Sequence, residues 1–294
     1  MLKTVEFGNS INDELSLALG FFDGVHLGHR TLLDRVRLYS VQHDLTPAVS
    51  TFSDMATRKE IIYDYHERRK IFEELGMSVC ISLSFLKIHK LNGKEFFDEL
   101  TSIYNIRHIV CGENYTFGSD KCDVKVLAEL CAENEIKLEV LPLLDVDCIR
   151  ASSSNIRNLL KNGNISLANK LLGEPYHVRG EVVHGDGRGK NLGIPTANLE
   201  PSLTAMKIRN GVYGTRVIID GNTYKSVTNY GPRPTFLQSK FAIETNVPNE
   251  KLHTLTGQNI KVYFYKYLRG VNKFANEKLL LNAIKKDLEW INED

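Results

Sequence analysis

The stretch that decides the fold of the first half of the chain is a short apolar run followed at once by a glycine-rich string. The run is Leu15-Ser16-Leu17-Ala18-Leu19, and the string is Gly20-Phe21-Phe22-Asp23-Gly24-Val25-His26-Leu27-Gly28-His29. The run predicts a buried strand, and the string leads into a helix expected from about residue 28 to residue 43. At such a junction the backbone N–H groups and the dipole of the helix attract phosphate.

The same alternation of strands and helices continues to about residue 172. Further strands are expected near residues 48–52, 78–83, 106–111 and 137–141, and helices near 67–75, 95–103, 124–134, 153–161 and 166–172. This rhythm predicts an α/β domain with a parallel sheet and helices on both faces. Ligands bind at the carboxyl ends of the strands in such a sheet, and the glycine-rich string lies at one of those ends.

The pattern changes near Glu174-Pro175, where short alternating segments replace the helices. These β-rich segments lie at 179–184, 212–219, 222–227, 241–247 and 260–267, with Gly, Asn and Pro between them. Asp220-Gly221 separates two of them and predicts a two-residue hairpin. The last stretch with helical spacing is 276–291. We therefore expect two domains, residues 1–174 and 175–294, the second a compact antiparallel β domain with a terminal helix.

The composition is that of a globular protein and excludes several classes. With 42% apolar and 25% charged residues the chain is not disordered. It has no run of about 18 apolar residues, so we expect no membrane span, and its first residues lack the layout of a secretory signal. The five cysteines include no C-x-x-C pair, which argues against a metal or disulfide framework and indicates a reducing cytoplasm. A formal net charge of +1 argues against nucleic-acid binding.

Two histidines in the glycine-rich string are the first candidates for chemistry. His26 and His29 are three residues apart at a helix start, so their rings can point the same way and donate to phosphate oxygens. Such donors stabilise the charge that builds on the α-phosphate during transfer. Gly24 and Gly28 let the backbone approach a ligand closely. The alternative is two surface histidines in a glycine turn.

Two further strings carry the residue types of a phosphate site. In Ser152-Ser153-Ser154-Asn155-Ile156-Arg157 the hydroxyl groups suit phosphate and Arg157 can pair with it, although a plain helix cap is the alternative. The string from Gly185 to Asn198 has glycines and cations but lacks G-K-[ST], so it is not a Walker A loop. Within it, Thr196 and Asn198 offer oxygen ligands that suit Mg²⁺ shared with substrate phosphates. A glycine-rich turn without a ligand is the alternative.

Glu244 is the candidate general base. It lies in a β-rich run among apolar neighbours, shortly after the string Thr228-Asn229-Tyr230-Gly231-Pro232-Arg233-Pro234-Thr235-Phe236. The alternative is a strand carboxylate that faces solvent.

Taken together, these strings resemble the bacterial bifunctional riboflavin kinase/FAD synthetase family over nearly the whole chain. The string at 20–29 is similar to the nucleotidyltransferase signature G-x-F-D-G-V-H-x-G-H, and the serine stretch is similar to I-S-S-T-x-I-R. The stretch at 112–118 resembles G-x-D-F-R-F-G. The string from His184 to Asn198 carries the whole kinase motif H-G-x-x-R-G-x-x-L-G-x-P-T-A-N and is the most specific match.

The resemblance implies a Rossmann-like FMN adenylyltransferase domain followed by an antiparallel β-barrel riboflavin kinase domain. It implies a cytoplasmic enzyme that converts riboflavin to FMN and FMN to FAD with ATP and Mg²⁺. Thr196 and Asn198 would hold Mg²⁺-ATP, and Glu244 would deprotonate the riboflavin hydroxyl group. The residues expected at ATP phosphates are Gly20, Phe22, Asp23, Gly24, Gly28, Ser152, Ser153, Arg157, Gly185, Gly187, Arg188, Gly189, Lys190 and Gly193, and those implied beside the flavin are Asn114, Asp123, Arg269, Lys273 and Phe274.

The sequence also departs from the family pattern. Ser53-Asp54-Met55-Ala56 stands where the family has Pro-His-Pro, and Thr116 replaces an arginine. Both changes predict a weaker hold on FMN. The stretch 246–249 replaces a more acidic and aromatic segment beside the kinase base. Two alternatives therefore stay open: a riboflavin kinase with a weakened or degenerate adenylyltransferase module, and a flavin-binding regulatory protein without turnover.

Overall fold

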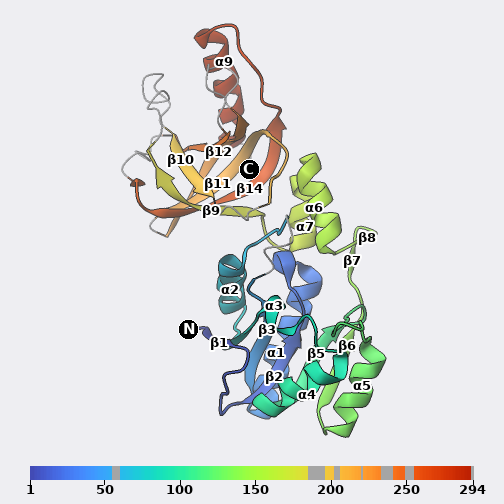
Figure 1. Cartoon of the computed structure of the whole chain (residues 1–294). Coiled ribbons are helices and arrows are strands. Elements are labelled where there is room, and N and C mark those ends of the chain that lie inside the picture. Colours follow the sequence, from blue (N-terminus) through green and yellow to red (C-terminus); the bar gives the residue numbers. More distant parts are fainter. Residues whose placement is uncertain are drawn as a thin grey trace. The chain divides into compact units, whose positions relative to one another are not determined.

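The computed structural model describes residues 1–54, 60–184, 196–201, 206–219, 221–232, 241–248 and 255–292. The chain divides into two compact units, residues 1–153 and 154–294 (Figure 1).

The first unit is built on a six-stranded sheet in the order β1-β4-β3-β2-β5-β6, in which every neighbouring pair is parallel. This confirms the predicted doubly wound α/β class. The strands are β1 (Lys3–Glu6), β2 (Glu14–Leu19), β3 (Thr46–Phe52), β4 (Val79–Leu83), β5 (Asn105–Gly112) and β6 (Lys137–Leu141).

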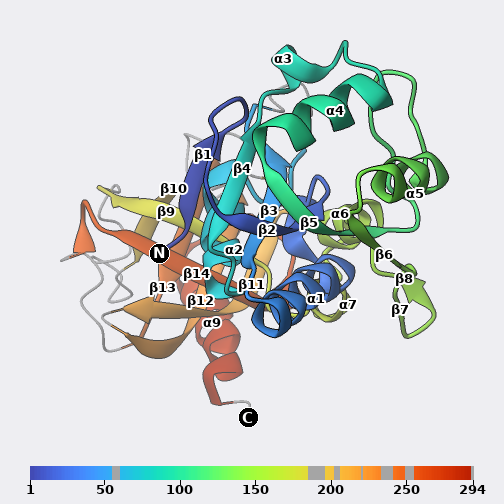
Figure 2. The same ribbon diagram turned by 90° about the horizontal axis from the view of Figure 1, so that it is seen from below.

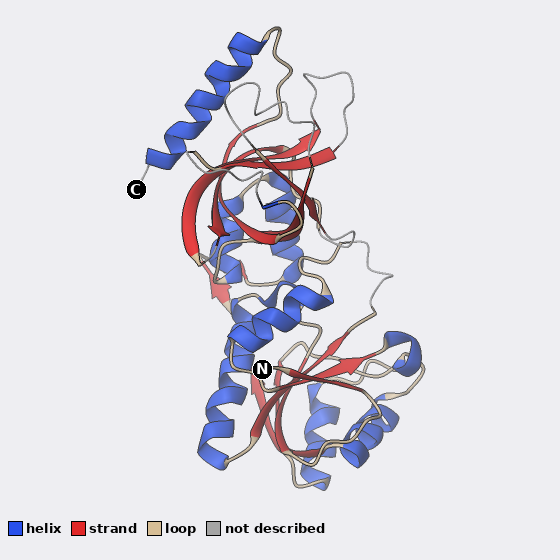
Figure 3. Cartoon of the chain, turned by 90° about the vertical axis from the view of Figure 1, so that its left-hand side faces the viewer, coloured by secondary structure: helices blue, strands red, loops and turns tan. Residues whose placement is uncertain are grey.

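Helices lie on both sides of this sheet (Figure 3). The side chains of β2 alternate between the two faces, as in any strand. Leu15, Leu17 and Leu19 join one apolar core with α4 (Gly93–Ile103) and α5 (Val124–Glu133). Ser16 faces the opposite way, and its hydroxyl group donates to the Val36 carbonyl of α1 (Leu27–His43) at 3.4 Å. The remaining elements before residue 153 are η1 (Asp23–Val25), α2 (Tyr65–Glu74), α3 (Phe85–Ile88) and the hairpin of β7 (Asp145–Val146) and β8 (Ile149–Arg150).

The edge strand β1 was not predicted from the sequence. It pairs in parallel with β4, beside which it lies in Figure 2. Of its four residues only Val5 is buried, so there is no apolar run that would signal a strand.

The second unit contains a closed antiparallel barrel in the order β10-β13-β12-β11-β14-β9. This confirms the predicted β domain. Its strands are β9 (His177–Val183), β10 (Ala197–Pro201), β11 (Gly211–Ile219), β12 (Asn222–Pro232), β13 (Phe241–Asn246) and β14 (Asn259–Arg269). The terminal helix is also confirmed, as α9 (Glu277–Asp287) followed by the 3-10 turn η3 (Leu288–Asn292).

Two helices that precede residue 175 belong to the same compact unit as the barrel. They are α6 (Ser153–Asn162) and α7 (Ile165–Leu172). The side-chain amide of Asn169 donates to the Phe264 carbonyl at 2.8 Å and accepts from the Tyr176 amide at 2.8 Å. The Arg209 amide donates to the Leu160 carbonyl at 3.1 Å. These contacts bear directly on where a separable C-terminal domain begins.

A pair of fragments tests the expected boundary at 174/175. We expect residues 154–294 to unfold cooperatively in urea with a higher free energy of unfolding than residues 175–294. The shorter fragment lacks both helices and the hydrogen bonds that join them to the rest of the unit, each worth about 1 kcal/mol. Equal stability of the two fragments would show that the helices contribute nothing, and a shorter fragment without a cooperative transition would move the boundary to 153/154.

Candidate active site

Residues 20–26 form a strained turn at the carboxyl end of β2. Phe22, Gly24 and Val25 have positive φ values of 56°, 78° and 41°. At Gly24 the positive φ favours glycine, and a Cβ atom there would also come within 2.8 Å of Cδ1 of Ile62. Phe22 is fully buried, with its ring centroid 5.7 Å from that of Phe72. Strained backbone of this kind persists where packing fixes it, and it clusters at functional sites.

The two histidines of the string come together at the start of α1. His26 is the N-cap residue, and its ring stacks on that of His29 with centroids 3.6 Å apart and an interplanar angle of 21°. Within the described residues, the Nδ1 atoms of both rings are buried and lack a hydrogen-bond partner. The rings therefore point the same way, as the spacing predicted.

Both rings are neutral near pH 7. Burial lowers the pKa of His26 to about 4. Burial, followed by the neighbouring His26 and Arg68, holds the pKa of His29 well below its ordinary value. A neutral imidazole carries one N–H donor and one acceptor nitrogen. The pair can donate to phosphate oxygens, and it adds no formal charge to the site.

The serine stretch is tied to this turn. The Ser153 hydroxyl group donates to the Asp23 carbonyl at 2.9 Å. The Asp23 carboxylate is 1% exposed and accepts from the Ile62 amide at 2.8 Å, so it takes part in holding the turn. Arg157, expected at the same phosphate site, lies on α6 in the second unit, where its guanidinium donates to the Ser154 hydroxyl group at 3.3 Å.

Of the residues implied beside the flavin in the first unit, Asn114 lies two residues beyond the end of β5, the strand that neighbours β2. Asn114 is exposed. Asp123 is the N-cap residue of α5 and accepts from the Lys125 amide at 2.9 Å. Asp54, in place of the family's Pro-His-Pro, accepts from the Phe85 amide at 2.7 Å and from the Ser84 hydroxyl group at 2.5 Å, and so fixes the start of α3. Burial alone would raise the pKa of Asp54, but these hydrogen bonds lower it below the ordinary value.

In the barrel, three polar residues form a row across neighbouring strands. Asn198 on β10 is paired with Glu244 on β13, which is paired in turn with Asn229 on β12. Residues that face each other across antiparallel strands lie on the same face, with Cβ atoms about 5 Å apart. Thr196 immediately precedes β10, two residues before Asn198. Carboxylate, amide and hydroxyl oxygens of this kind are ligands that suit a hard divalent cation.

The row lies on one face of β13, and the buried side chains of Ile243 and Thr245 lie on the other. Ile243 and Thr245 are 1% and 0% exposed, and the Thr245 hydroxyl group lies 2.9 Å from that of Thr228. Glu244 between them is half-buried. Spacing along the chain does not place Asn229 beside Glu244, because their pairing arises only from the strand register.

The residues implied beside the flavin at the end of β14 are brought together. The Arg269 guanidinium lies 5.5 Å from the ring centroid of Phe274 and donates to both carboxylate oxygens of Asp287 on α9, at 2.9 and 2.7 Å. Lys273 is exposed. The phosphate candidates of the kinase motif lie outside the described residues: Gly185, Gly187, Arg188, Gly189, Lys190 and Gly193.

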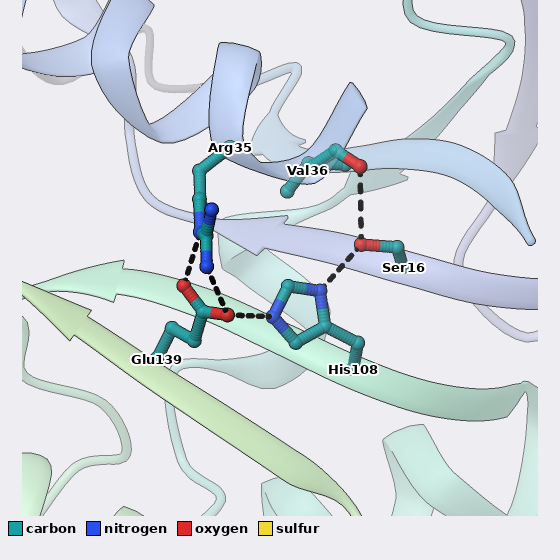
Figure 4. Close-up of polar contacts among 5 residues, drawn as sticks. All are labelled: Ser16, Arg35, Val36, His108 and Glu139. Carbon is teal, nitrogen blue, oxygen red and sulfur yellow. Dashed lines mark hydrogen bonds and ion pairs between the residues drawn. The ribbon is translucent and has the colours of Figure 1, made fainter. Parts of the chain in front are cut away.

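A polar chain links α1 to three strands of the sheet (Figure 4). The Ser16 hydroxyl group lies 2.7 Å from Nδ1 of His108, and Nε2 of His108 lies 3.5 Å from the Glu139 carboxylate. Glu139 accepts a bidentate pair of hydrogen bonds from Arg35 on α1. Burial lowers the pKa of His108 to about 4, although Glu139 acts in the opposite direction. No sequence motif indicates this cluster, because its members come from four separate segments.

These depressed values predict acid sensitivity of the first unit. A histidine with a pKa of 6.5 unfolded and about 4 folded contributes stability that is complete above pH 6.5 and is lost as the pH falls towards 4. We expect His26 and His108 each to lower the free energy of unfolding by about 2 kcal/mol between pH 7 and pH 5.

Urea titrations followed by circular dichroism at both pH values measure this loss. The fluorescence of the single tryptophan, Trp290, reports on the second unit separately. His108→Gln should shrink the difference between the two pH values, and His66→Gln, at an exposed position of α2, should leave it unchanged. A pH dependence that is the same in His108→Gln and in the wild type would contradict the prediction.

Two family models divide the chain between them. One, described as FAD synthetase, matches residues 9–155, and the other, described as riboflavin kinase, matches residues 172–293. The bifunctional riboflavin kinase/FMN adenylyltransferase of Bacillus subtilis (strain 168) is 32% identical over 286 residues, which cover 92% of this chain and 89% of that protein. The chain belongs to the bifunctional riboflavin kinase/FMN adenylyltransferase family.

Other relatives agree over the same length. The bifunctional riboflavin kinase/FMN adenylyltransferase of Escherichia coli (strain K12) is 28% identical, with 92% of this chain and 90% of that protein covered. A crystal structure of a protein described as a macrolide-efflux protein from Streptococcus pneumoniae matches 99% of both chains, with a TM-score of 0.88 and 28% identity.

Membership in this family makes the chain a transferase of flavin cofactor biosynthesis. Riboflavin, FMN, FAD and ATP are the substrates and products of the family's reactions, which use ATP with a divalent cation. None of the helices in the described part of the chain is both long enough and apolar enough to span a bilayer.

Proposed function

We propose that the second unit phosphorylates riboflavin to FMN and that the first unit adenylylates FMN to FAD. The observation that carries the proposal is the presence of a separate polar site in each unit. The barrel sets Asn198 beside Glu244, and the start of α1 sets His26 against His29. A flavin-binding protein without turnover would need neither a base beside oxygen ligands nor paired donors at a helix N-terminus.

In the kinase step, Glu244 accepts the proton of the ribityl 5′-hydroxyl group. The hydroxyl oxygen attacks the γ-phosphate of ATP in line, and ADP leaves. Thr196 and Asn198 would hold Mg²⁺ together with the ATP phosphates. When bound, Mg²⁺ neutralises the charge of the phosphate oxygens. The half-buried position of Glu244 lets it reach the substrate while its strand neighbours fix its backbone.

In the adenylyl-transfer step, an oxygen of the FMN phosphate attacks the α-phosphate of ATP, and pyrophosphate leaves. His26 and His29 donate N–H groups to the oxygens on which charge builds, aided by the positive end of the α1 dipole. Because both rings are neutral, they act as donors without giving up a proton. No covalent intermediate is needed.

We expect this second step to require more FMN than is typical of the family. Asp54 carries a carboxylate where the family has Pro-His-Pro, and Thr116 has no charge where the family has arginine. Losing one charge-assisted contact to a phosphate costs about 1.5–3 kcal/mol, or roughly 10- to 150-fold in affinity. FMN should therefore accumulate before FAD when riboflavin is supplied.

The test is to incubate the protein with riboflavin, ATP and Mg²⁺ and to separate the three flavins by chromatography over time. The proposal predicts FMN first and FAD later, with FAD formation rising as FMN is raised towards millimolar concentrations. FMN without any FAD at saturating FMN would leave a riboflavin kinase with a degenerate first unit. Binding of flavin without either product would indicate the regulatory protein, and FAD appearing before FMN accumulates would contradict the raised requirement.

A further inference from the structure

Arg68 is a buried cation beside the strained turn that carries the histidine pair. It lies on α2, and only 1% of it is exposed. Burial lowers the pKa of its guanidinium, while the carboxylate of Asp23 acts in the opposite direction. A buried charge is costly unless hydrogen bonds satisfy it. Among the described residues Arg68 makes no ion pair, and its hydrogen bonds go to three oxygen atoms.

These oxygens belong to the chain segments that follow β2 and end β3. Nη1 of Arg68 donates to the Phe21 carbonyl at 2.7 Å and also to the Thr51 hydroxyl group. Nη2 donates to the Phe52 carbonyl at 2.8 Å. The Thr51 hydroxyl group donates in turn to the Phe21 carbonyl at 2.8 Å. One planar guanidinium thus joins both segments, which a lysine ammonium cannot reproduce.

The bonded carbonyl belongs to the peptide that leads into the strained residue. Phe22 adopts the left-handed conformation, which costs about 1–2 kcal/mol for a residue other than glycine. Its ring centroid lies 5.1 Å from that of His29, which stacks on His26. Fixing the Phe21 carbonyl therefore fixes the orientation of Phe22 and the wall against which the histidine pair packs.

We propose that Arg68 is a positioning residue for adenylyl transfer, which locks the Phe21–Phe22 peptide and through it the His26–His29 pair. The inference rests on the proposed function of that pair. Arg68 also keeps a permanent positive charge beside a site for an anionic substrate, where both histidine rings are neutral.

The test compares three variants in the full-length protein: Arg68→Met, Arg68→Lys and, as a matched control, Arg69→Met. Arg69 is the next residue of α2, a half-buried arginine whose guanidinium lies 5.7 Å from the Tyr65 ring centroid. We expect Arg68→Met to lower kcat for FAD formation about 100-fold, because small misplacements of catalytic groups cost that much. The KM for ATP should change less than about threefold, and FMN formation by the second unit of the same molecule should be unchanged. Arg68→Lys keeps the charge but cannot bond both segments, so its kcat for FAD formation should lie between those of Arg68→Met and the wild type. Arg69→Met should have the wild-type kcat.

A readout that does not depend on turnover separates this inference from the proposed function. In NMR spectra of histidine-labelled protein, Arg68→Met should shift the ring signals of His26 and His29, and Arg69→Met should leave them in place. FAD formation by Arg68→Met within about threefold of the wild type, or unshifted ring signals, overturns the inference. If Arg68→Met unfolds the first unit, Arg68→Lys tests the positioning role instead. A kcat for FAD formation equal to that of the wild type would refute the role, and a kcat about tenfold lower with an unchanged KM would support it. If the wild type forms no FAD, the proposed adenylyl transfer is refuted. The ring signals of His26 and His29 then show by themselves whether Arg68 positions the histidine pair.

Discussion

Replacement of Glu244 by glutamine is expected to lower the rate of riboflavin phosphorylation by on the order of 10²–10⁴, the usual contribution of a general base. The change keeps the size of the side chain and removes only its ability to accept a proton. Riboflavin binding, followed by quenching of flavin fluorescence, should stay close to that of the wild type. FAD formation from added FMN should be unaffected, because that step uses the first unit.

A matched control lies on the neighbouring strand. Glu200 of β10 is exposed in the same barrel and is paired with Glu181 on β9, so Glu200→Gln makes the same chemical change at a carboxylate that is not paired with a member of the row formed by Asn198, Glu244 and Asn229. It should phosphorylate riboflavin as the wild type does. If Glu244→Gln kept more than about a tenth of the wild-type turnover, Glu244 would not be the base.

His29→Ala is expected to abolish FAD formation while leaving FMN formation intact. The substitution removes one N–H donor at the α-phosphate, a loss that typically costs on the order of 10²–10³ in rate. It also leaves His26 without its stacking partner, whose ring centroid is 3.6 Å away. Because the two reactions belong to different units, the rate of FMN formation in the same sample shows that the protein is intact.

His43→Ala serves as the control on the same helix. His43 lies in the last turn of α1, exposed and stacked on Tyr39, far along the helix from its start. It should not change FAD formation. Should His29→Ala make FAD at a rate close to that of the wild type, the histidine pair would have no part in transfer, and the phosphate site would have to lie elsewhere in the first unit.

The fold could be predicted from the sequence wherever a strand is a continuous apolar run. The strands β2 and β4 come close to this condition, since each is a mainly apolar run whose residues are nearly all buried. The strands β1 and β10 do not. Only Val5 is buried in β1. Strand β10 alternates two buried residues with polar ones, and it begins at Ala197, inside the glycine-rich string from Gly185 to Asn198. Local composition does not reveal such strands, because they form by pairing with neighbouring strands and not through an apolar run of their own.

The residues of the candidate site could likewise be predicted where they lie close together in the sequence, and not where folding alone brings them together. His26 and His29 could be recognised because the turn, the glycines and the helix start lie within ten residues of one another. Arg68 was missed because its partner, the Phe21 carbonyl, lies 47 residues away. Asn229 was missed because strand register, and not spacing along the chain, places it beside Glu244.

The polar chain of Figure 4 has the residue order of a catalytic triad but not its geometry. A serine, a histidine and an acidic residue follow one another as in a serine hydrolase, but the two ring nitrogens are exchanged, with Nδ1 towards Ser16 and Nε2 towards Glu139. Ser16 and His108 are both fully buried. No acyl group can reach the hydroxyl oxygen, and fluorophosphonate reagents should leave Ser16 unlabelled in the folded protein. Residue order alone would suggest a hydrolase here, where the chain holds a helix against its sheet.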